Sequence, residues 1–422
     1  MSLYNADELT APSWIDGEFL QKVLGQYENK GDVEILTYDM SPASMKGDHY
    51  ASIMFRCKVN YRQTNTGRRI LKKSLIIKTL PVEDGHKREM LMQSKLFETE
   101  IDMYAETLPK IEKILAGCGE PTKLSAGLIY HSLDPHKIII FEDLCELGYD
   151  TVRSRFLTEN EIKAVYSKLA KLHAVSYMLG NSENHALVTK YQEGIFSTSM
   201  PLADEMMRSG INNFIDMLSC YEEFDVYYEK IKLMKDKLSR LCKDLYRSYT
   251  LNNGKGDIFV LNHGDFHMKN MMFKFDKKQQ MEDVMMVDYQ ISCYAPSNID
   301  LVYSQFMMLS PELRLRRHEL MQYYFTEFIR ILRKINYQGE LPLYSQFQMA
   351  GLKYRHFTVF LVATFLPMVV GIIGKPLEEL KDVDTDKMFE NPDMIAMIYR
   401  APAFVEEARK ILPILLREGY LD

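Results

Sequence analysis

The sequence predicts an α+β fold in two parts, a small strand-rich N-terminal lobe and a larger helix-rich C-terminal lobe. Three observations support this prediction. Residues 52–60 alternate between apolar and polar side chains, as a half-buried strand does. Residues 137–141 (KIIIF) indicate a short buried strand, and beyond residue 158 the apolar residues mostly recur at helical spacing.

A change in character near residues 142–147 marks the expected boundary between the lobes. We therefore expect an N-terminal domain over residues 1–144 and a C-terminal domain over residues 145–422. A chain of 422 residues is long enough for two such core-forming domains.

The N-terminal lobe is expected to begin with a short amphipathic helix over residues 13–24. Strands follow over residues 52–60 and 70–80, and Pro81 stops the second because proline cannot donate to a strand ladder. The turn signal TNTG between them predicts an antiparallel hairpin. A helix is then expected over residues 86–106.

The C-terminal lobe is expected to be mainly helical. Thr158 and Glu161 have the spacing of a capping box, which predicts that a helix begins directly after Thr158. Further helical stretches are predicted over residues 200–248 and 311–334.

Residues 357–373 (FTVFLVATFLPMVVGII) form a strongly apolar segment of 17 residues. A membrane-spanning helix needs roughly 20 apolar residues, and this segment also contains Pro367. We therefore predict a buried core helix that kinks or ends near Pro367, and no membrane span.

Composition narrows the class of protein. The net charge is −6, whereas a nucleic-acid-binding protein usually carries a basic surface, so we expect no nucleic-acid partner. The six cysteines are scattered without C-x-x-C spacing, which argues against zinc and redox motifs and fits a reducing compartment. The segment MSLYNADELTAPSW lacks the basic-then-apolar pattern of a secretory signal, so cytoplasm is the expected location.

The segment HGDFHMKN, residues 263–270, places Asp265 and Asn270 five positions apart in a polar loop between two short apolar strands. Another apolar strand, residues 284–287, leads directly into Asp288. A carboxylate at the end of a buried strand can point into a cleft, so these three side chains are candidates for chemistry.

Two further charged residues complete the set. Lys78 ends the apolar strand SLIIK, and Glu100 lies on the helix that follows. Phosphoryl transfer needs a lysine on the phosphates, a carboxylate that holds this lysine, oxygen ligands for magnesium and a carboxylate near the attacking hydroxyl. On this hypothesis the loop holds Asp265 against an acceptor hydroxyl while Asn270 reaches a metal.

Several neighbouring residues have simpler interpretations. Glu98 is a rival for the role of Glu100, but it lies on another face of the helix, and the spacing F-x-x-E-x-x-x-Y favours Glu100. His263 is expected to form structural hydrogen bonds, because Asp265 already fills the role of base. His173 is expected to be a satisfied core histidine on an apolar helix face.

Taken in order, the motifs resemble a known family. The D-x-x-x-x-N…D pattern at Asp265, Asn270 and Asp288 resembles the protein-kinase-like superfamily, and HGD in place of HRD resembles its small-molecule branch of aminoglycoside phosphotransferases and choline kinases. Within that branch the chain most closely resembles the ecdysteroid kinase-like (CHK kinase-like) family. The matching segments are PSW at 12–14, KGDHYAS at 46–52, FETEIDMY at 97–104, FEDL at 141–144, LHAVS at 172–176, HGDFHMKNMMF at 263–273, VDYQ at 287–290 and NIDL at 298–301.

The resemblance implies a bilobal protein-kinase-like fold and an enzyme that uses ATP and Mg²⁺ to phosphorylate an alcohol group of a small molecule. An ecdysteroid or a lipophilic hydroxylated xenobiotic, as handled in detoxification, would be the acceptor. The implied roles are Asp265 as catalytic base or hydroxyl-orienting group, Asn270 and Asp288 as magnesium ligands, Lys78 on the nucleotide phosphates with Glu100 as its partner, the backbone of Glu142, Asp143 and Leu144 against the adenine, and Asp300 as a brace for the catalytic loop.

The chain departs from the family pattern at two places. Gly47 is the only glycine over residues 40–56, although a loop that covers phosphates usually needs glycine for close backbone approach. His267 stands where the family often has an aromatic residue.

Three alternatives remain. A choline or ethanolamine kinase would need aromatic and acidic residues around a cationic amine, and aromatic pairs such as Tyr303 and Phe306 could line such a pocket, although they are more often core. A catalytically silent nucleotide-binding protein is favoured only by the glycine-poor loop. A protein kinase is disfavoured because only twelve positions separate Asp288 from Asp300 and no arginine precedes Asp265.

Overall fold

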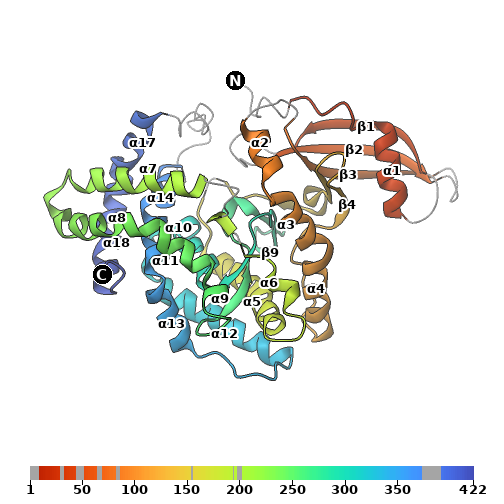
Figure 1. Ribbon diagram of the computed structural model, residues 1–422. Coiled ribbons are helices and arrows are strands. Elements are labelled where there is room, and N and C mark those ends of the chain that lie inside the picture. Colours follow the sequence, from red (N-terminus) through yellow and green to blue (C-terminus); the bar gives the residue numbers. More distant parts are fainter. Residues whose placement is uncertain are drawn as a thin grey trace. The chain divides into compact units, whose positions relative to one another are not determined.

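The computed structural model describes residues 9–28, 33–43, 52–63, 69–81, 86–153, 155–192, 194–196, 202–372 and 391–422. Strands are concentrated in the N-terminal part of the chain and helices in the C-terminal part (Figure 1), so the predicted α+β class is confirmed. Gly47 and the predicted TNTG turn lie outside the described residues.

The chain forms two compact units, and each is described here by itself. Unit 1 comprises residues 1–108, 125–150 and 272–290, and unit 2 comprises the rest of the chain. Neither unit is one continuous stretch of sequence, whereas the expected lobes were continuous. The boundary between two lobes at residues 144/145 therefore stays a prediction.

Unit 1 is built on a five-stranded antiparallel sheet (Figure 1). Its strands, in spatial order, are β1 (Val33–Pro42), β2 (Ile53–Gln63), β3 (Ile70–Thr79), β5 (Ile138–Glu142) and β4 (Leu128–Ser132). The predicted hairpin is the β2–β3 pair, with Met54 opposite Lys78. β1 and β4 were not predicted, because both carry mixed patterns of burial that give no clear alternation in the sequence.

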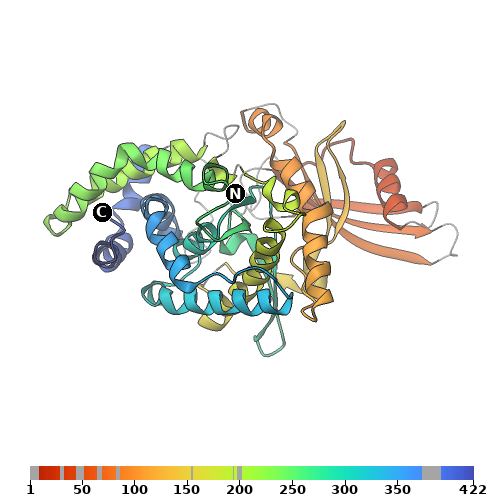
Figure 2. The ribbon, with the colours of Figure 1, turned by 60° about the horizontal axis from the view of Figure 1, so that its bottom comes forward.

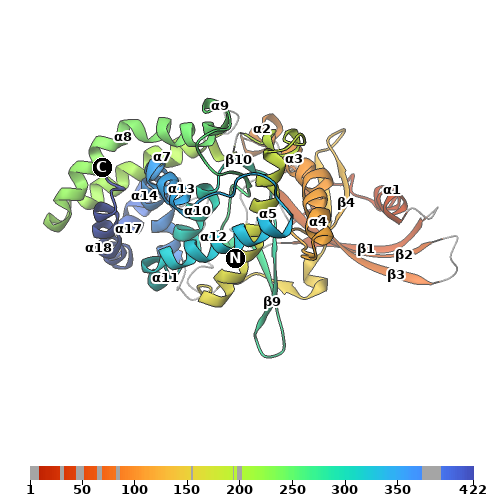
Figure 3. The same ribbon diagram turned by 90° about the horizontal axis from the view of Figure 1, so that it is seen from below.

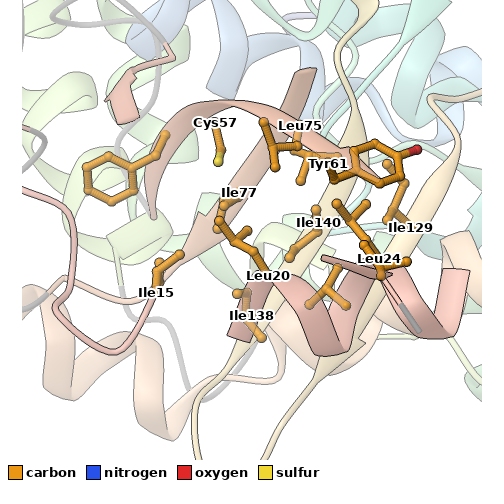
Figure 4. Close-up of a cluster of buried hydrophobic side chains, with 14 of the residues drawn as sticks. Ile15, Leu20, Leu24, Cys57, Tyr61, Leu75, Ile77, Ile129, Ile138 and Ile140 are labelled. Carbon is orange, nitrogen blue, oxygen red and sulfur yellow. The ribbon is translucent and has the colours of Figure 1, made fainter. Parts of the chain in front are cut away.

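Helix α1 (Gly17–Glu28) covers one face of this sheet, and the two bury a shared apolar core (Figure 4). Leu20 and Leu24 of the helix meet Cys57, Leu75 and other inward-facing side chains of the strands. The helix begins four residues later than predicted. The Asp16 carboxylate accepts from Phe19 N at 2.9 Å and so satisfies a backbone N–H group at the helix start.

The opposite face of the sheet carries Lys78, the lysine predicted to bind phosphate. Successive residues of a strand point to opposite faces. Phe55 and Ile77 face α1, and therefore Met54, Arg56, Ile76 and Lys78 project from the other face.

The predicted single helix over residues 86–106 is interrupted. The structure has α2 (His86–Gln93), α3 (Leu96–Asp102) and a π-helical turn, Met103–Thr107. At the break, the Ser94 hydroxyl donates to Leu91 O at 3.0 Å, and such a local bond competes with helix continuation.

A second sheet in unit 1 consists of β6 (Tyr149–Asp150), β8 (Met271–Phe275) and β9 (Met281–Met286). The β8–β9 pair forms the hairpin at the label β9 in Figure 3. β9 starts and ends earlier than the predicted strand over residues 284–287. The strand stops before Asp288, which has a positive φ of 67° that a strand residue cannot adopt.

Unit 2 is mainly helical. Its helices are α4 (Leu108–Gly117), α5 (Glu159–Gly180), α6 (Ala186–Thr189), α7 (Leu202–Leu218), α8 (Asp225–Tyr246), α9 (Ser248–Leu251), α10 (Asn298–Met307), α11 (Pro311–Leu315), α12 (Arg317–Lys334), α13 (Tyr344–Lys353), α14 (Arg355–Ile372), α17 (Pro392–Tyr399) and α18 (Pro402–Arg417). Helix α12 runs along α5 (Figures 2 and 3), and the short strands β7 (Phe259–Asn262) and β10 (Cys293–Pro296) pair antiparallel. The predicted capping box at Thr158 and Glu161 is confirmed at the start of α5.

The apolar segment around Pro367 is confirmed as buried helix. Phe360, Leu361 and Leu366 of α14 are fully buried. The helix continues past Pro367 instead of ending there. Proline has no N–H for the carbonyl four residues earlier, and the Tyr399 hydroxyl donates to that carbonyl, Ala363 O, at 2.6 Å. None of the helices in the described part of the chain has the length and apolarity that crossing a membrane requires.

Candidate active site

The lysine predicted at the end of β3 lies in a buried ionic cluster of unit 1. Lys78 Nζ lies 2.5 Å from Glu100 Oε2 on α3 and 2.7 Å from Asp288 Oδ1. Lys78 and Glu100 are 3% and 1% exposed, whereas the Asp288 side chain is 21% exposed. Strand β3 and helix α3 thus hold a charged pair in the interior, and Asp288 is its accessible member.

Electrostatics favour the charged form of the lysine. Burial lowers the pKa of Lys78, but the charges of Asp288 and Glu100 outweigh burial and raise it above its usual value. Burial raises the pKa of Glu100, and Lys78 offsets only part of that effect. One cation faces two carboxylates in this cluster. The cluster can therefore bind a further positive charge beside Asp288.

Gln290, which had no predicted role, orients Asp288, and the neighbouring Tyr289 packs against a residue of the π-helical turn. The Gln290 amide accepts from Lys78 Nζ at 3.4 Å and donates to Asp288 Oδ2 at 3.1 Å. Tyr104, in the π-helical turn, packs edge-on against Tyr289 with ring centroids 5.7 Å apart. A π-helical turn at this position is a signal of function that can be read only from the structure.

The segment Glu142 to Leu144 begins at the last residue of β5 in unit 1, and its acidic side chains are already engaged. Asp143 is buried and accepts from Arg56 Nε and Ser74 Oγ, each at 2.7 Å. Burial raises the pKa of Asp143, but the hydrogen bonds have the larger effect, so the pKa lies below its usual value. Glu142 Oε1 accepts from Gly127 N at 2.6 Å. Both acidic side chains are therefore committed to contacts within unit 1.

The loop HGDFHMKN lies in unit 2, after β7. The Asp265 side chain is 21% exposed, and both of its oxygens have partners. Tyr303 donates to Oδ1 at 2.8 Å, and Asn270 Nδ2 donates to Oδ2 at 2.9 Å. His267 Nε2 lies 3.2 Å from Oδ1. Burial raises the pKa of Asp265, but His267 and Tyr303 outweigh it and lower the pKa well below the usual value.

Asp300, on α10, holds the backbone of this loop. It is fully buried, and its carboxylate accepts from His263 N at 2.7 Å and from Gly264 N at 2.9 Å. Gly264 has a φ of +88°, and a Cβ there would lie 2.1 Å from Ile291 O, so the turn requires glycine. His173 is buried, with Nε2 3.2 Å from Asp300 and Nδ1 2.7 Å from the Tyr324 hydroxyl, as expected of a satisfied core histidine.

The structure thus groups the candidate residues within each unit. In unit 1, Lys78, Glu100 and Asp288 share one cluster, whereas Glu98, the rival of Glu100, pairs with Lys137 at 2.9 Å. In unit 2, Asp265, Asn270 and His263 share one loop, and Asp300 of α10 accepts hydrogen bonds from the backbone of that loop.

The donor chemistry fits magnesium. Mg²⁺ prefers oxygen ligands, and proteins usually supply one or two of them while phosphates and waters complete the shell. Asn270 uses its amide nitrogen on Asp265, which leaves the amide oxygen for a metal, and the Asp288 carboxylate is accessible. The described residues contain no group of three or more His, Cys, Asp and Glu side chains suited to a metal.

Comparisons with known proteins identify the family. The model of the ecdysteroid kinase-like family matches residues 46–337, well over half of the 422 residues. The chain therefore belongs to the ecdysteroid kinase-like family, a family of kinase-like phosphotransferases, and the predicted resemblance is confirmed.

A search of curated proteins finds no match to this sequence. Among solved structures, spectinomycin phosphotransferase APH(9)-Ia, in complex with ADP and spectinomycin, is 16% identical with a TM-score of 0.41, over 92% of this chain and 98% of that chain. The GDP and kanamycin complex of APH(2")-IIia is 14% identical with a TM-score of 0.39, over 92% of this chain and 99% of that chain.

Proposed function

We propose that this protein is an ATP- and magnesium-dependent kinase that phosphorylates an alcohol group of a small molecule. Family membership supports phosphoryl transfer in general. The observation that carries the proposal is the buried Lys78 shared by Glu100 and Asp288, because it combines a phosphate-binding cation with an accessible carboxylate.

In the proposed mechanism, the charged Lys78 binds the nucleotide phosphates, and Glu100 fixes its position. The backbone of Glu142, Asp143 and Leu144 contacts the adenine. Asn270 and Asp288 are the residues that would hold magnesium, which would supply neutralisation of the charge on the phosphates.

The acceptor hydroxyl is oriented or deprotonated by Asp265, whose low pKa keeps it ionised at neutral pH. Asp300 and His263 keep the loop in place through the backbone bonds described above. Positioning and charge neutralisation supply most of the catalysis of phosphoryl transfer.

For the acceptor, we propose a lipophilic hydroxylated compound such as an ecdysteroid or a xenobiotic. The family supports this choice, and so does an apolar surface near Asp265: the half-buried Phe365 packs against Tyr303 with centroids 5.4 Å apart. We also propose a cytoplasmic location, which the six free cysteines support.

The test is mass spectrometry of reactions with Mg-ATP and a panel of ecdysteroids, plant phenols and glycosides, choline and ethanolamine. We expect an ecdysteroid or phenol to gain a phosphoryl group with wild type and not with Asp265→Asn. Asp236→Asn is the matched control, since it removes the same charge from an exposed site on α8.

Other outcomes separate the alternatives. Phosphorylation of choline alone would contradict the acceptor class and support a choline kinase. Binding of Mg-ATP without turnover of any acceptor would contradict the kinase proposal and support a silent nucleotide-binding protein.

A further inference from the structure

Both oxygens of the Asp265 carboxylate are engaged, but not equally. A carboxylate oxygen has about two acceptor positions. Tyr303 and His267 both approach Oδ1, at 2.8 and 3.2 Å, whereas among the described residues only Asn270 donates to Oδ2, at 2.9 Å. Counted in this way, Oδ1 is saturated and Oδ2 keeps one acceptor position.

His267 can act as a donor here because its backbone surroundings select the tautomer. Its Nδ1 accepts from Lys269 N at 3.2 Å, so the proton of the neutral ring sits on Nε2, the atom that faces Asp265. The His267 ring is stacked on that of Tyr303, with centroids 6.2 Å apart and planes inclined by 24°.

Tyr303 approaches Asp265 from a fixed direction. It lies on α10 one turn after Asp300, on the same helix face, so one helix holds both the loop backbone and the carboxylate. Tyr303 is 2% exposed, and Phe365 of α14 packs against its ring. Burial, followed by the charge of Asp265, raises the pKa of Tyr303, so its hydroxyl stays protonated and donates.

We infer that Tyr303 and His267 are positioning residues that saturate Oδ1 of Asp265 and thereby present Oδ2 to the acceptor hydroxyl. The inference rests on the proposed function for the identity of the acceptor step. Without these two donors the carboxylate can turn about its terminal bond, since that torsion has broad minima, and the oxygen facing the acceptor is no longer defined.

The kinetic test compares three single variants. Tyr303→Phe removes only the hydroxyl, His267→Phe keeps a flat ring but removes the donor, and His267→Gln keeps an N–H donor. We expect kcat to fall about 10-fold in both Phe variants, which corresponds to the loss of one oriented hydrogen bond, with KM for ATP unchanged and with recovery in His267→Gln.

Tyr166→Phe is the matched control for stability. Tyr166 is buried and its hydroxyl is 2.7 Å from Ser304, the neighbour of Tyr303 on α10, so this variant also loses a buried tyrosine hydroxyl but leaves Asp265 untouched. If Tyr303 had only a structural role, Tyr166→Phe would lower kcat as much as Tyr303→Phe does, and the inference would fail.

A spectroscopic test needs no turnover and separates this inference from the proposed function. In protein labelled with ¹⁵N-histidine, the His267 signal is identified by its absence from His267→Gln. We expect the neutral Nε2–H tautomer, with a resonance that shifts in Asp265→Asn and Tyr303→Phe but not in Tyr166→Phe. An Nδ1–H tautomer, or a signal insensitive to Asp265→Asn, would overturn the inference even in an active enzyme.

Discussion

The two parts of the candidate site stabilise negative charge in different ways. In unit 1, the carboxylates of Glu100 and Asp288 are balanced by an opposite charge, the ammonium group of Lys78. In unit 2, the carboxylate of Asp265 is surrounded by Tyr303, Asn270 and His267, and that of Asp300 by two backbone N–H groups and His173. The first arrangement uses a full cation, and the second uses hydrogen-bond donors with no lysine or arginine among them.

This difference predicts how each part responds to substitution. A buried ion pair depends on every member, because removal of one partner leaves an uncompensated charge in a medium that solvates it poorly. A network of donors loses one hydrogen bond at a time, and each loss costs less. The effects of substitution should therefore be abrupt in unit 1 and graded in unit 2.

The largest effect is expected for Lys78→Met. It leaves Glu100 buried without its cation, so we expect the free energy of unfolding to fall by about 3–5 kcal/mol and phosphotransfer to be lost. Urea denaturation measures the first effect and a phosphoryl-transfer assay the second.

A double variant serves as control for this prediction. Lys78→Met combined with Glu100→Gln removes the unpaired charge and should recover part of the lost stability without recovering activity. If Lys78→Met alone were as stable as wild type, charge would not hold the cluster together. The contrast drawn between units 1 and 2 would then be wrong.

An intermediate effect is expected for His173→Gln in unit 2. Burial lowers the pKa of His173, although Asp300 opposes this, so the folded state prefers the neutral ring. Such a group contributes stability above its unfolded pKa, near 6.5, and loses it as pH falls through the lower folded pKa. At pH 8 we expect a loss of about 1–2 kcal/mol for the two hydrogen bonds of the ring.

The lowered pKa of His173 also predicts how the effect of His173→Gln depends on pH. Below pH 6.5 only the wild type must take up a proton at residue 173 on unfolding, so the difference between the two proteins should shrink by about 1 kcal/mol at pH 5.5. Urea denaturation at pH 8 and at pH 5.5 measures the change. A difference that grows on acidification would mean that the ring is charged in the folded state.

The smallest effect is expected for Glu120→Gln, which tests whether burial or charge sets the cost. Lys334, Arg330 and Lys171 of unit 2 contact Glu120, and the first of these contributes most to lowering its pKa to about 2. The three cations are partly exposed, so we expect a loss of only about 0.5–1 kcal/mol at pH 7.

This contribution should disappear in acid. The depressed pKa means that the stabilisation is present above about pH 4.5 and is lost as pH falls toward about 2. Glu406→Gln is the control and should cost less, because Glu406 pairs only loosely with two exposed cations, Arg409 at 3.3 Å and Lys410 at 4.0 Å. If Glu120→Gln cost as much as Lys78→Met, charge alone and not burial would govern these clusters.

Several features could be predicted from the sequence because they depend on local pattern. The position of Lys78 followed from a strand that Pro81 stops, and the start of α5 from the capping box at Thr158. The buried helix around Pro367 followed from its apolar composition. Spacing alone favoured Glu100 over Glu98, and the ion pairs of the structure agree with that choice.

Other features could not be predicted, because they depend on how elements distant in the sequence pack. Tyr303 was considered only as a possible lining of an acceptor pocket, whereas its hydroxyl contacts Asp265, 38 positions earlier. The π-helical turn at Tyr104 and the break of the helix at Ser94 also carry no periodic signal in the sequence.

The sequence by itself determined the α+β class, the elements with a clear local pattern such as β2, β3 and α5, and the identity of the charged groups, since these are properties of neighbouring residues. Only the tertiary structure decided which donors reach which carboxylate oxygen. The reason is physical: a hydrogen bond requires an approach within about 3 Å, and that distance depends on the packing of whole helices and strands.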